Sequence, residues 1–269
     1  MLRLCILASG SAGNCMYIAS RNSALLIDAG LSARETLRRM DLVGIDSSSV
    51  NAICLTHEHS DHISGLPALC RKLDVSVYAN SGTVDAVERA LGPDRVRWQV
   101  FTTGSQFSIG DMTVEPFSVP HDSYDPVGFA IQSENTRIGV ATDLGMPTSL
   151  IRHHLKGCNA LVLEANHSER MLKNAKRPWS LKQRIMGRQG HLSNTSTAQL
   201  VADLAQDTLS HVYLAHLSSD CNTPDKAVQT VVAELNARSF NNIMVIPALQ
   251  GEPSQIWESD ARPARDPSG

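Results

Sequence analysis

The stretch THEHSDH, residues 56–62, places three of the chain's 10 histidines and two carboxylates within seven residues. It follows AICL (52–55), an apolar run typical of a buried strand. Alternate side chains of an extended segment share a face, so we expect His57, His59 and Asp61 to point the same way. His62 would begin the turn into a helix. Imidazole and carboxylate ligands together suit zinc, manganese or iron and argue against calcium.

Three further ligand-type residues stand in the same setting, each at the end of an apolar strand. His121 follows EPFSV and Pro120, Asp143 ends RIGVAT, and His216 ends HVYLA. One loop cannot complete a two-metal site, so we expect these residues to complete it. His153 and His154 lie within SLIRHHLKG, where they fit the surface or the end of a helix.

The elements that must position these residues form two series, each running from strands into helices. Apolar runs predict strands at 4–9, 16–20, 24–30, 52–57, 112–119, 128–133, 137–143, 160–165, 211–217 and 242–248. Helical periodicity marks 33–40, 63–73, 82–91, 147–155, 196–205 and 224–238. These strands are too many for one small sheet. Two sheets with helices outside would bury both sets of apolar faces, in an α/β fold.

The length and composition suit one large folded unit. The chain has 269 residues, of which 42% are hydrophobic, enough for a sizeable core. The end of the chain, ESDARPARDPSG, contains no apolar residue apart from alanine. We therefore expect one domain over residues 1–252 and a flexible tail over residues 253–269.

Cysteine usage and the N-terminus favour a cytoplasmic protein. The six cysteines form no CxxC pair, and Cys5, Cys54 and Cys158 sit in or beside apolar runs, so we expect them to be buried and reduced. The first apolar run ends at Ala8, which is short for a signal peptide. No run approaches the length of a membrane span, so no membrane partner is expected.

The ligand-type residues have the order and spacing of a known family. THEHSDH, with Asp28 upstream in LLIDAG and the three strand-end residues downstream, resembles the metallo-β-lactamase superfamily over about residues 1 to 250. The resemblance implies a four-layer αββα sandwich with two divalent metals at one edge of the sheets. It also implies roles: one metal is held by His57, His59 and His121, the other by Asp61, His62 and His216, with Asp143 bridging both and Asp28 orienting the loop.

Four local motifs resemble one branch of this superfamily, the YycJ/WalJ branch. They are ASGSAGNC (8–15), PHDSYDPVGF (120–129), the segment 166–194, and LAHLSSDCNTP (214–224). This resemblance implies a bacterial cytoplasmic 5′-to-3′ exonuclease on double-stranded DNA, linked to DNA repair. GHLSN and LAHLS also resemble, more weakly, segments of the tRNA-processing nuclease RNase Z, so an RNA-processing nuclease is an alternative.

The charge distribution points to nucleic acid independently of the family. Residues 167–190 contain seven Lys or Arg and one acid, a balance of +6, so the rest of the chain carries −9 of the total of −3. A basic segment beside a predicted metal site is suited to bind the phosphate backbone of a nucleic acid. The expected substrate contacts are Lys176, Arg177, Lys182, Arg184 and, by stacking on a base, Trp179. The alternative is a solvated amphipathic helix with a buried Trp. Pro178 should break the segment into two pieces.

The glycine-rich stretch SGSAGNC (9–15) allows two interpretations. Gly10 and Gly13 suit a tight hairpin near the site, or they leave backbone N–H groups open to a phosphate. No Gly-Lys-Ser/Thr follows, so the stretch is not a Walker loop. The turn is the favoured interpretation, and substrate contact would come from Ser9, Ser11 or Asn14.

A two-metal site of this kind predicts a hydrolase. Two metals would lower the pKa of a bridging water to give a hydroxide that attacks phosphorus. His191, in GHLSN, is the candidate general acid for the departing 3′ oxygen, or it orients a ligand or caps a helix. Glu164, at the end of ALVLEA, could fix the tautomer of that imidazole. A lactonase or thioesterase would share every ligand but should have an apolar pocket and no basic groove.

Overall fold

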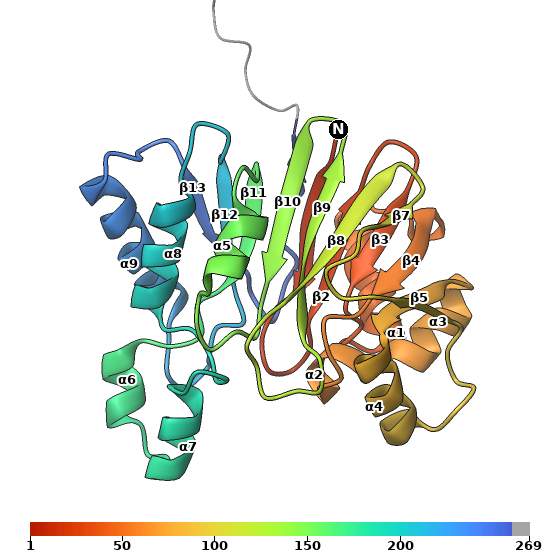
Figure 1. Ribbon diagram of the computed structural model, residues 1–269, viewed down its shortest axis with the longest axis horizontal. Coiled ribbons are helices and arrows are strands. Elements are labelled where there is room, and N and C mark those ends of the chain that lie inside the picture. Colours follow the sequence, from red (N-terminus) through yellow and green to blue (C-terminus); the bar gives the residue numbers. More distant parts are fainter. Residues whose placement is uncertain (260–269) are drawn as a thin grey trace, which may run out of the picture.

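The computed structural model describes residues 1–259 and contains two seven-stranded sheets packed face to face (Figure 1). The strand order is β14-β1-β2-β3-β4-β5-β6 in the first sheet and β13-β12-β11-β10-β9-β8-β7 in the second. The first sheet comprises β1 (Arg3–Ala8), β2 (Cys15–Ala19), β3 (Ala24–Ile27), β4 (Val50–Cys54), β5 (Ser76–Asn80), β6 (Trp98–Phe101) and β14 (Trp257–Glu258). The second comprises β7 (Phe107–Ile109), β8 (Met112–Ser118), β9 (Val127–Ser133), β10 (Thr136–Ala141), β11 (Ala160–Glu164), β12 (His211–Ala215) and β13 (Met244–Pro247).

Helices cover the outer faces of both sheets, which gives the predicted four-layer αββα sandwich (Figure 1). The first sheet is covered by α1 (Ala33–Leu42), α3 (Leu66–Leu73) and α4 (Ser81–Leu91), and the second by α5 (Ser149–Leu155), α8 (Asn194–Leu204) and α9 (Pro224–Ala237). The short helices α2 (Ser60–Ile63), α6 (Glu169–Asn174), α7 (Trp179–Ile185) and the 3₁₀ turn η1 (Ser47–Ser49) complete the described elements.

Residue alternation explains why the strands read as continuous apolar runs. In β1, Leu4 and Ile6 face the second sheet, whereas Cys5 and Leu7 face the helices. A strand buried on both faces needs apolar residues at every position. The core between the sheets includes the fully buried Phe129, whose ring meets Phe101 of the opposite sheet edge-on at 6.0 Å between centroids.

Strand direction brings the predicted ligands to one edge of the sandwich. β3, β4 and β5 are parallel, and so are β10, β11, β12 and β13. β8 is antiparallel to β9, which is antiparallel to β10, so β8 ends at the same edge as β10. The residues that follow these strands therefore lie together, at the lower edge in Figure 1 where α2 is drawn.

The structure corrects two expectations about the elements and confirms a third. Four strands, β5, β6, β7 and β14, were not predicted. The segment 167–190 contains α6 and α7 with a break before Trp179, as Pro178 indicated. The tail does not begin at residue 253, because Trp257 and Glu258 pair with Leu4 and Arg3 of β1. The rest of the predicted tail, residues 260–269, lies outside the described residues.

The buried polar and sulfur-containing residues add two outcomes. All six cysteines are free and buried, including the three expected to be so. His153 and His154 lie in the last turn of α5, one of the two positions expected for them. The His154 ring is half-buried: it stacks on Phe117 at 4.9 Å between centroids, and its Nδ1 lies 3.3 Å from a carboxylate oxygen of Glu115. Within residues 1–259, no helix has the length and apolar character needed to span a bilayer.

Candidate metal centre

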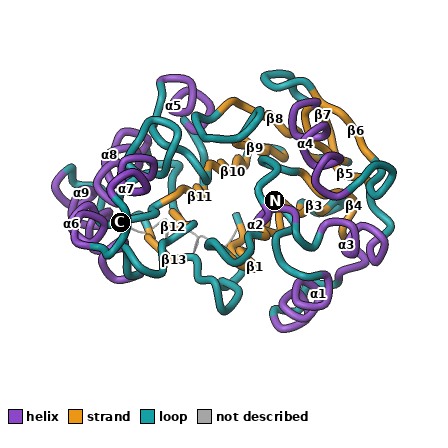
Figure 2. Tube along the Cα trace, turned by 90° about the horizontal axis from the view of Figure 1, so that it is seen from below, coloured by secondary structure: helices purple, strands orange, loops and turns teal. Residues whose placement is uncertain are grey.

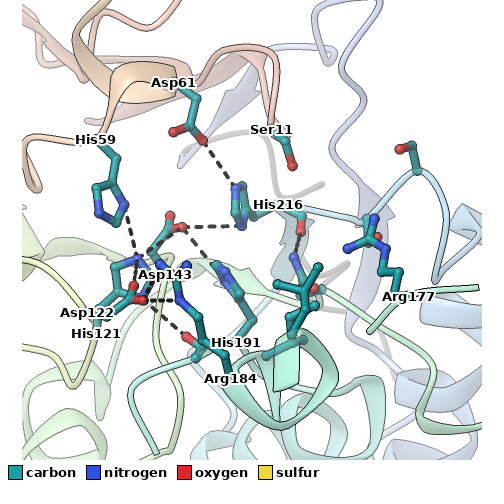
Figure 3. A pocket seen from close by; sticks show the side chains of 16 residues that line it. Ser11, His59, Asp61, His121, Asp122, Asp143, Arg177, Arg184, His191 and His216 are labelled. Carbon is teal, nitrogen blue, oxygen red and sulfur yellow. Dashed lines mark hydrogen bonds and ion pairs between the residues drawn. The ribbon is translucent and has the colours of Figure 1, made fainter. Parts of the chain in front are cut away.

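Histidine and carboxylate side chains from both sheets converge at this edge (Figure 3). These side chains form four groups, and within each group the potential ligand atoms lie within 4.8 Å of one another. The groups are His57, His59 and His121; Asp61, His62 and His216; His57, His62 and Asp143; and Asp143, Glu164, His191 and His216. The fold thus brings together all seven residues predicted as metal ligands. It also arranges six of them in the two predicted sets of three, with Asp143 next to His62 and His216. Their role as ligands stays a prediction.

Three of the histidines are oriented by acceptors at Nδ1. The Nδ1 of His62 lies 2.7 Å from Asp28 Oδ2, that of His121 lies 3.2 Å from the Gly190 carbonyl oxygen, and that of His216 lies 2.9 Å from Glu164 Oε1. Each acceptor favours the tautomer with the proton on Nδ1. The Nε2 lone pair is then directed into the cluster, as metal ligation requires.

Several buried polar atoms at the cluster lack any hydrogen-bond partner among the described residues. They are Nε2 of His57, Nε2 of His216 and Oδ2 of Asp143. An unsatisfied buried polar atom costs on the order of 1–3 kcal/mol. Divalent cations at the two predicted sites would satisfy these atoms, and nitrogen with carboxylate oxygen is a donor set that suits zinc, manganese or iron. The residues present therefore fit a metal centre.

The electrostatics of the cluster favour bound positive charge. Burial alone would lower the pKa of His62, but Asp28 and Asp143 outweigh it and raise the pKa well above the usual value. Burial alone would also lower the pKa of His216, but Asp143, Asp61 and Glu164 outweigh burial and raise the pKa to about 10. Burial alone would raise the pKa of Asp143, but His216 and His62 outweigh burial and hold the pKa well below its usual range.

Asp28 supports the loop of the first sheet. It is fully buried and accepts the Thr56 backbone N–H at 2.8 Å and the Thr56 hydroxyl at 2.9 Å, in addition to His62. The same hydroxyl lies 2.9 Å from Nδ1 of His57. One carboxylate therefore orients two of the predicted ligands, directly and through Thr56, a residue that the sequence analysis did not single out.

Glu164 supports the residues of the second sheet. Its Oε1 lies 2.7 Å from Nδ1 of His191 and 2.9 Å from that of His216, and its Oε2 accepts the backbone N–H groups of Leu144 and Leu192 at 2.9 and 3.1 Å. Burial alone would raise the pKa of Glu164, but the two histidines outweigh it and hold the pKa at about 2. The contact with His191 is the one expected, and the contact with His216 was not foreseen.

Three residues of the site have a left-handed backbone that is unusual outside glycine. Asp28, Asp143 and His216 have φ angles of 63°, 55° and 53°. Each follows the end of a strand; Asp143 and His216 turn their side chains into the cluster, and Asp28 turns its side chain to His62. This conformation costs on the order of 1 kcal/mol per residue and tends to persist where function requires it.

The Ser9–Asn14 loop joins the two halves of the site. Asn14 is fully buried, and its Nδ2 donates to Asp61 Oδ2 at 3.1 Å and lies 3.1 Å from His62 Nε2. Ser9 is 2% exposed, and its Oγ accepts the His216 backbone N–H at 2.7 Å. The expected substrate contact is therefore wrong for Ser9 and Asn14, which position predicted ligands instead. Ser11 is exposed and lines the pocket.

A pocket of about 390 Å³ opens over the cluster (Figure 3). Its floor carries His59, Asp61, His121, Asp143, His191 and His216. One wall is α7, which presents Leu181, Arg184 and Ile185, and Arg177 lies beside it. Most of the lining residues are polar or charged by type, whereas small-molecule sites are lined mostly by apolar and aromatic residues.

The basic segment is only partly available to a substrate. Arg177 pairs with Asp220 at 2.6 Å, and Arg184 pairs with Asp122 at 2.6 Å. Both arginines and Asp122 line the pocket. Lys182 is 8% exposed and donates to the Lys173 carbonyl oxygen at 2.6 Å, so its expected substrate contact is wrong.

The remaining expected contacts of this segment face solvent. Lys176 is exposed, and Trp179 is 60% exposed. The alternative of an amphipathic helix with a buried Trp is therefore wrong for this residue. An exposed indole beside a lysine leaves a base-stacking role open to Trp179.

Comparison with known proteins agrees with this geometry. Residues 23–217 match the family model of the β-lactamase superfamily domain. The chain belongs to the metallo-β-lactamase superfamily. Within this superfamily it is 37% identical to exodeoxyribonuclease YycJ of Bacillus anthracis over 97% of this chain and 96% of that protein. It is 34% identical to exodeoxyribonuclease WalJ of Streptococcus pneumoniae over 86% and 87% of the two chains.

Two further comparisons concern the superfamily fold and the weaker resemblance to RNase Z. The crystal structure of the metallo-β-lactamase fold protein YhfI from Bacillus subtilis superposes with a TM-score of 0.71, covering 95% of this chain and 98% of that one at 14% identity, which speaks to the fold alone. A ribonuclease Z of Bradyrhizobium diazoefficiens is 27% identical over 55% of this chain and 54% of that protein. The resemblance to the exodeoxyribonucleases extends over more of the chain.

Proposed function

We propose that the protein is a two-metal phosphodiesterase that removes nucleotides from the 5′ ends of double-stranded DNA. The observation that carries this proposal is the convergence of seven ligand-type side chains under a pocket that has α7 of the basic segment as one wall. The relatives at 37% and 34% identity, both called exodeoxyribonucleases, support DNA as the substrate. A cytoplasmic role in DNA repair is part of the proposal.

The chain's own residues would divide the work at a metal centre. His57, His59 and His121 would hold one ion, and Asp61, His62 and His216 the other, with Asp143 shared between them. Divalent ions bound there would activate water and offset the negative charge of the phosphate. Asp28, Thr56 and Glu164 would keep the ligand imidazoles in the required orientation.

His191 is suited to protonate the departing 3′ oxygen. Its side chain lines the pocket, is 23% exposed and is held through Nδ1 by the buried Glu164 at 2.7 Å. With Nδ1 engaged, Nε2 is the nitrogen left to exchange a proton with substrate. Burial alone would lower the pKa of His191, but Glu164 raises it above the usual value, which favours the proton-carrying form that a general acid needs.

The polar pocket argues against the small-molecule alternative. Leu181 and Ile185 are the apolar side chains among the lining residues, whereas the two arginines and the carboxylates dominate. A lactone or thioester with an apolar tail would find only these two apolar side chains in the lining. An RNA-processing nuclease is a second candidate, because the partial similarity to ribonuclease Z covers half of this chain.

The test is digestion of end-labelled duplexes by purified protein loaded with Mn²⁺ or Zn²⁺. A 5′ label should leave as a mononucleotide in the earliest samples, while a 3′-labelled strand shortens step by step. Cleavage of a tRNA precursor but not of duplex DNA would favour the RNA nuclease. Turnover of a thioester or lactone without cleavage of any nucleic acid would overturn the proposal.

A further inference from the structure

Tyr124 is an exposed aromatic residue on the loop that also carries His121. At 64%, it is the most exposed of the large hydrophobic side chains within residues 1–259. An aromatic ring that stays exposed contributes little hydrophobic stabilisation to the fold, so packing does not explain why this ring is held in a fixed position. Tyr124 is three positions after His121, so its Cα lies within roughly 10 Å of the Cα of that predicted ligand.

Three contacts hold this ring although it faces solvent. Arg89 of α4 donates from Nη1 to the Tyr124 hydroxyl at 2.9 Å, and its guanidinium carbon lies 4.8 Å from the ring centroid. The Tyr124 backbone N–H donates to Oε1 of Glu58 at 3.1 Å. Glu58 belongs to the THEHSDH loop, so the ring is fixed relative to the predicted metal ligands by the loop that bears them.

The surrounding structure makes Tyr124 and α4 one rigid unit. Asn80, the N-cap of α4, donates from Nδ2 to the Asp125 carbonyl oxygen at 2.8 Å. Gly82 lies so close to the loop that an added Cβ would come within 2.9 Å of the Asp125 Cβ. A ring held on such a support loses little conformational entropy when a ligand stacks on it.

The helix that carries the Arg89 partner of Tyr124 and the helix of the basic segment lie on either side of the metal loops. α4, which carries Arg89, and α7, which begins with Trp179, lie on opposite sides of α2 in both views (Figures 1 and 2). α2 contains Asp61 and His62. A nucleic acid strand that crosses the cluster with its backbone toward α7 would therefore pass Tyr124 on the far side.

The charges near Tyr124 select a base over a phosphate. Glu58 accepts the Tyr124 backbone N–H, and Asp122 and Asp125 lie close to it in the chain. The cation that contacts the ring, Arg89, is already engaged with the Tyr124 hydroxyl and ring. Acidic neighbours repel a phosphate, whereas the face of a neutral base is tolerated. We propose that Tyr124, supported by Arg89 and Glu58, is a stacking platform for a nucleobase of the substrate, on the opposite side of the metal cluster from α7. This inference rests on the proposed function.

The test compares Tyr124→Ala with Tyr124→Phe in the metal-loaded full-length protein. The probes are a DNA duplex with 2-aminopurine at successive positions and bis(p-nitrophenyl) phosphate, a diester without a nucleobase. For Tyr124→Ala we expect KM for DNA to rise about tenfold and the preference for DNA over the diester to fall about tenfold, as loss of one stacking contact predicts. The Tyr124→Phe variant keeps the ring and should stay within about twofold of the native protein.

Salt dependence and fluorescence separate stacking from charge attraction. The effect of Tyr124→Ala should be equal at about 50 and 200 mM KCl, whereas that of Lys176→Ala should shrink as salt rises. One 2-aminopurine position should be quenched by the native protein and not by Tyr124→Ala. The platform is wrong if native protein cleaves DNA and Tyr124→Ala matches it, or if Tyr124→Phe loses as much as Tyr124→Ala. If native protein neither binds nor cleaves nucleic acid, the proposed function fails and this inference with it.

Discussion

Asp28 in the first sheet and Glu164 in the second occupy equivalent positions on the two sides of the candidate metal centre, yet they are built differently. Both are fully buried, both follow or end a strand, and both accept backbone N–H groups and an imidazole Nδ1. Within residues 1–259, the Asp28 carboxylate is bonded only to Thr56 and His62, which belong to one short loop. Glu164 collects groups from residues 144, 191, 192 and 216.

The difference separates a local half of the site from a tertiary half. In the first sheet, chain connectivity already keeps the predicted ligands close, and the carboxylate only sets their orientation. In the second sheet, the groups are up to 72 positions apart in the chain, between residues 144 and 216, and only the packed fold brings them together. Substitutions in the first half should reduce metal binding, and substitutions in the second half should reduce both metal binding and the catalytic rate.

Loss of Asp143, where the two halves meet, should have the largest effect. Its carboxylate lies 3.3 Å from both His62 Nε2 and His216 Nδ1. Asp143→Ala should lower kcat/KM on the order of 10⁴-fold, about 5 kcal/mol, and reduce bound metal. Activity assays and elemental analysis check this. Asp74→Ala, at a side chain that is 91% exposed, is the control, and a variant of Asp143 with both metals and full rate would refute the shared-ligand assignment.

Removal of His191 tests whether the tertiary half also transfers a proton. His191→Ala should slow DNA hydrolysis by about 10²–10³-fold, because the 3′ oxygen then departs without a proton donor. A substrate with a p-nitrophenolate leaving group needs no such proton and should lose much less. Steady-state rates on the two substrates provide the measurement. An equal loss on both would assign His191 to orientation or metal binding.

The two carboxylates themselves can be compared directly. Asp28→Asn should weaken metal affinity by about 10–100-fold, and Glu164→Gln should lower kcat by about 10–100-fold, as expected when a partner of a ligand imidazole is altered. Metal titration and kcat at saturating metal distinguish the outcomes. If saturating metal restores Glu164→Gln to the native rate, then Glu164 acts through metal affinity alone and the contrast between the halves disappears.

Two ion pairs away from the site repeat the contrast on a smaller scale. Glu35 bonds to Arg38 and Arg39 within α1, whereas Glu115 of β8 reaches Arg137 of β10 at 2.6 Å. Glu115→Gln should cost about 1 kcal/mol of unfolding free energy at pH 7 and Glu35→Gln about 0.3–0.5 kcal/mol. Urea unfolding at pH 7 measures both. Equal costs would remove the contrast.

The pH dependence of the Glu115 pair follows from its pKa. Burial alone would raise the pKa of Glu115, but Arg137 outweighs it and lowers the pKa below the usual value. The folded state therefore holds this proton less firmly than the unfolded state, so the stabilisation is complete above about pH 4.3 and is lost as pH falls through the folded pKa. The difference between native protein and Glu115→Gln should shrink over that window. A difference that persists at pH 3 would point to packing as its source.

Much of the fold could be predicted, and the omissions have physical reasons. Strands buried on both faces, such as β1 and β11, are continuous apolar runs and were found within a few residues. β6 and β7 are short and partly exposed edge strands, so they lack that signal. β14 has only two residues and exists because β1 offers an open edge to pair with.

The site, like the fold, was predicted correctly in one part and wrongly in another. The seven ligand-type residues were chosen from their types and from their position after apolar strands, and all of them converge. The errors concern neighbours: Ser9, Asn14 and Lys182 are buried and bond to other parts of the chain. Whether a polar side chain faces substrate or protein depends on packing, which spacing along the chain does not encode.

The sequence by itself determined the class of chemistry, because THEHSDH keeps four ligand-type groups on one short loop and apolar strands put the other three at strand ends. Tertiary structure alone decided which groups support them and which surfaces a substrate meets. Glu164 beside His216, Asn14 beside Asp61, and Tyr124 braced by Arg89 and Glu58 join residues far apart in the chain. Such contacts exist only once two sheets have packed face to face and brought their strand ends to a single edge.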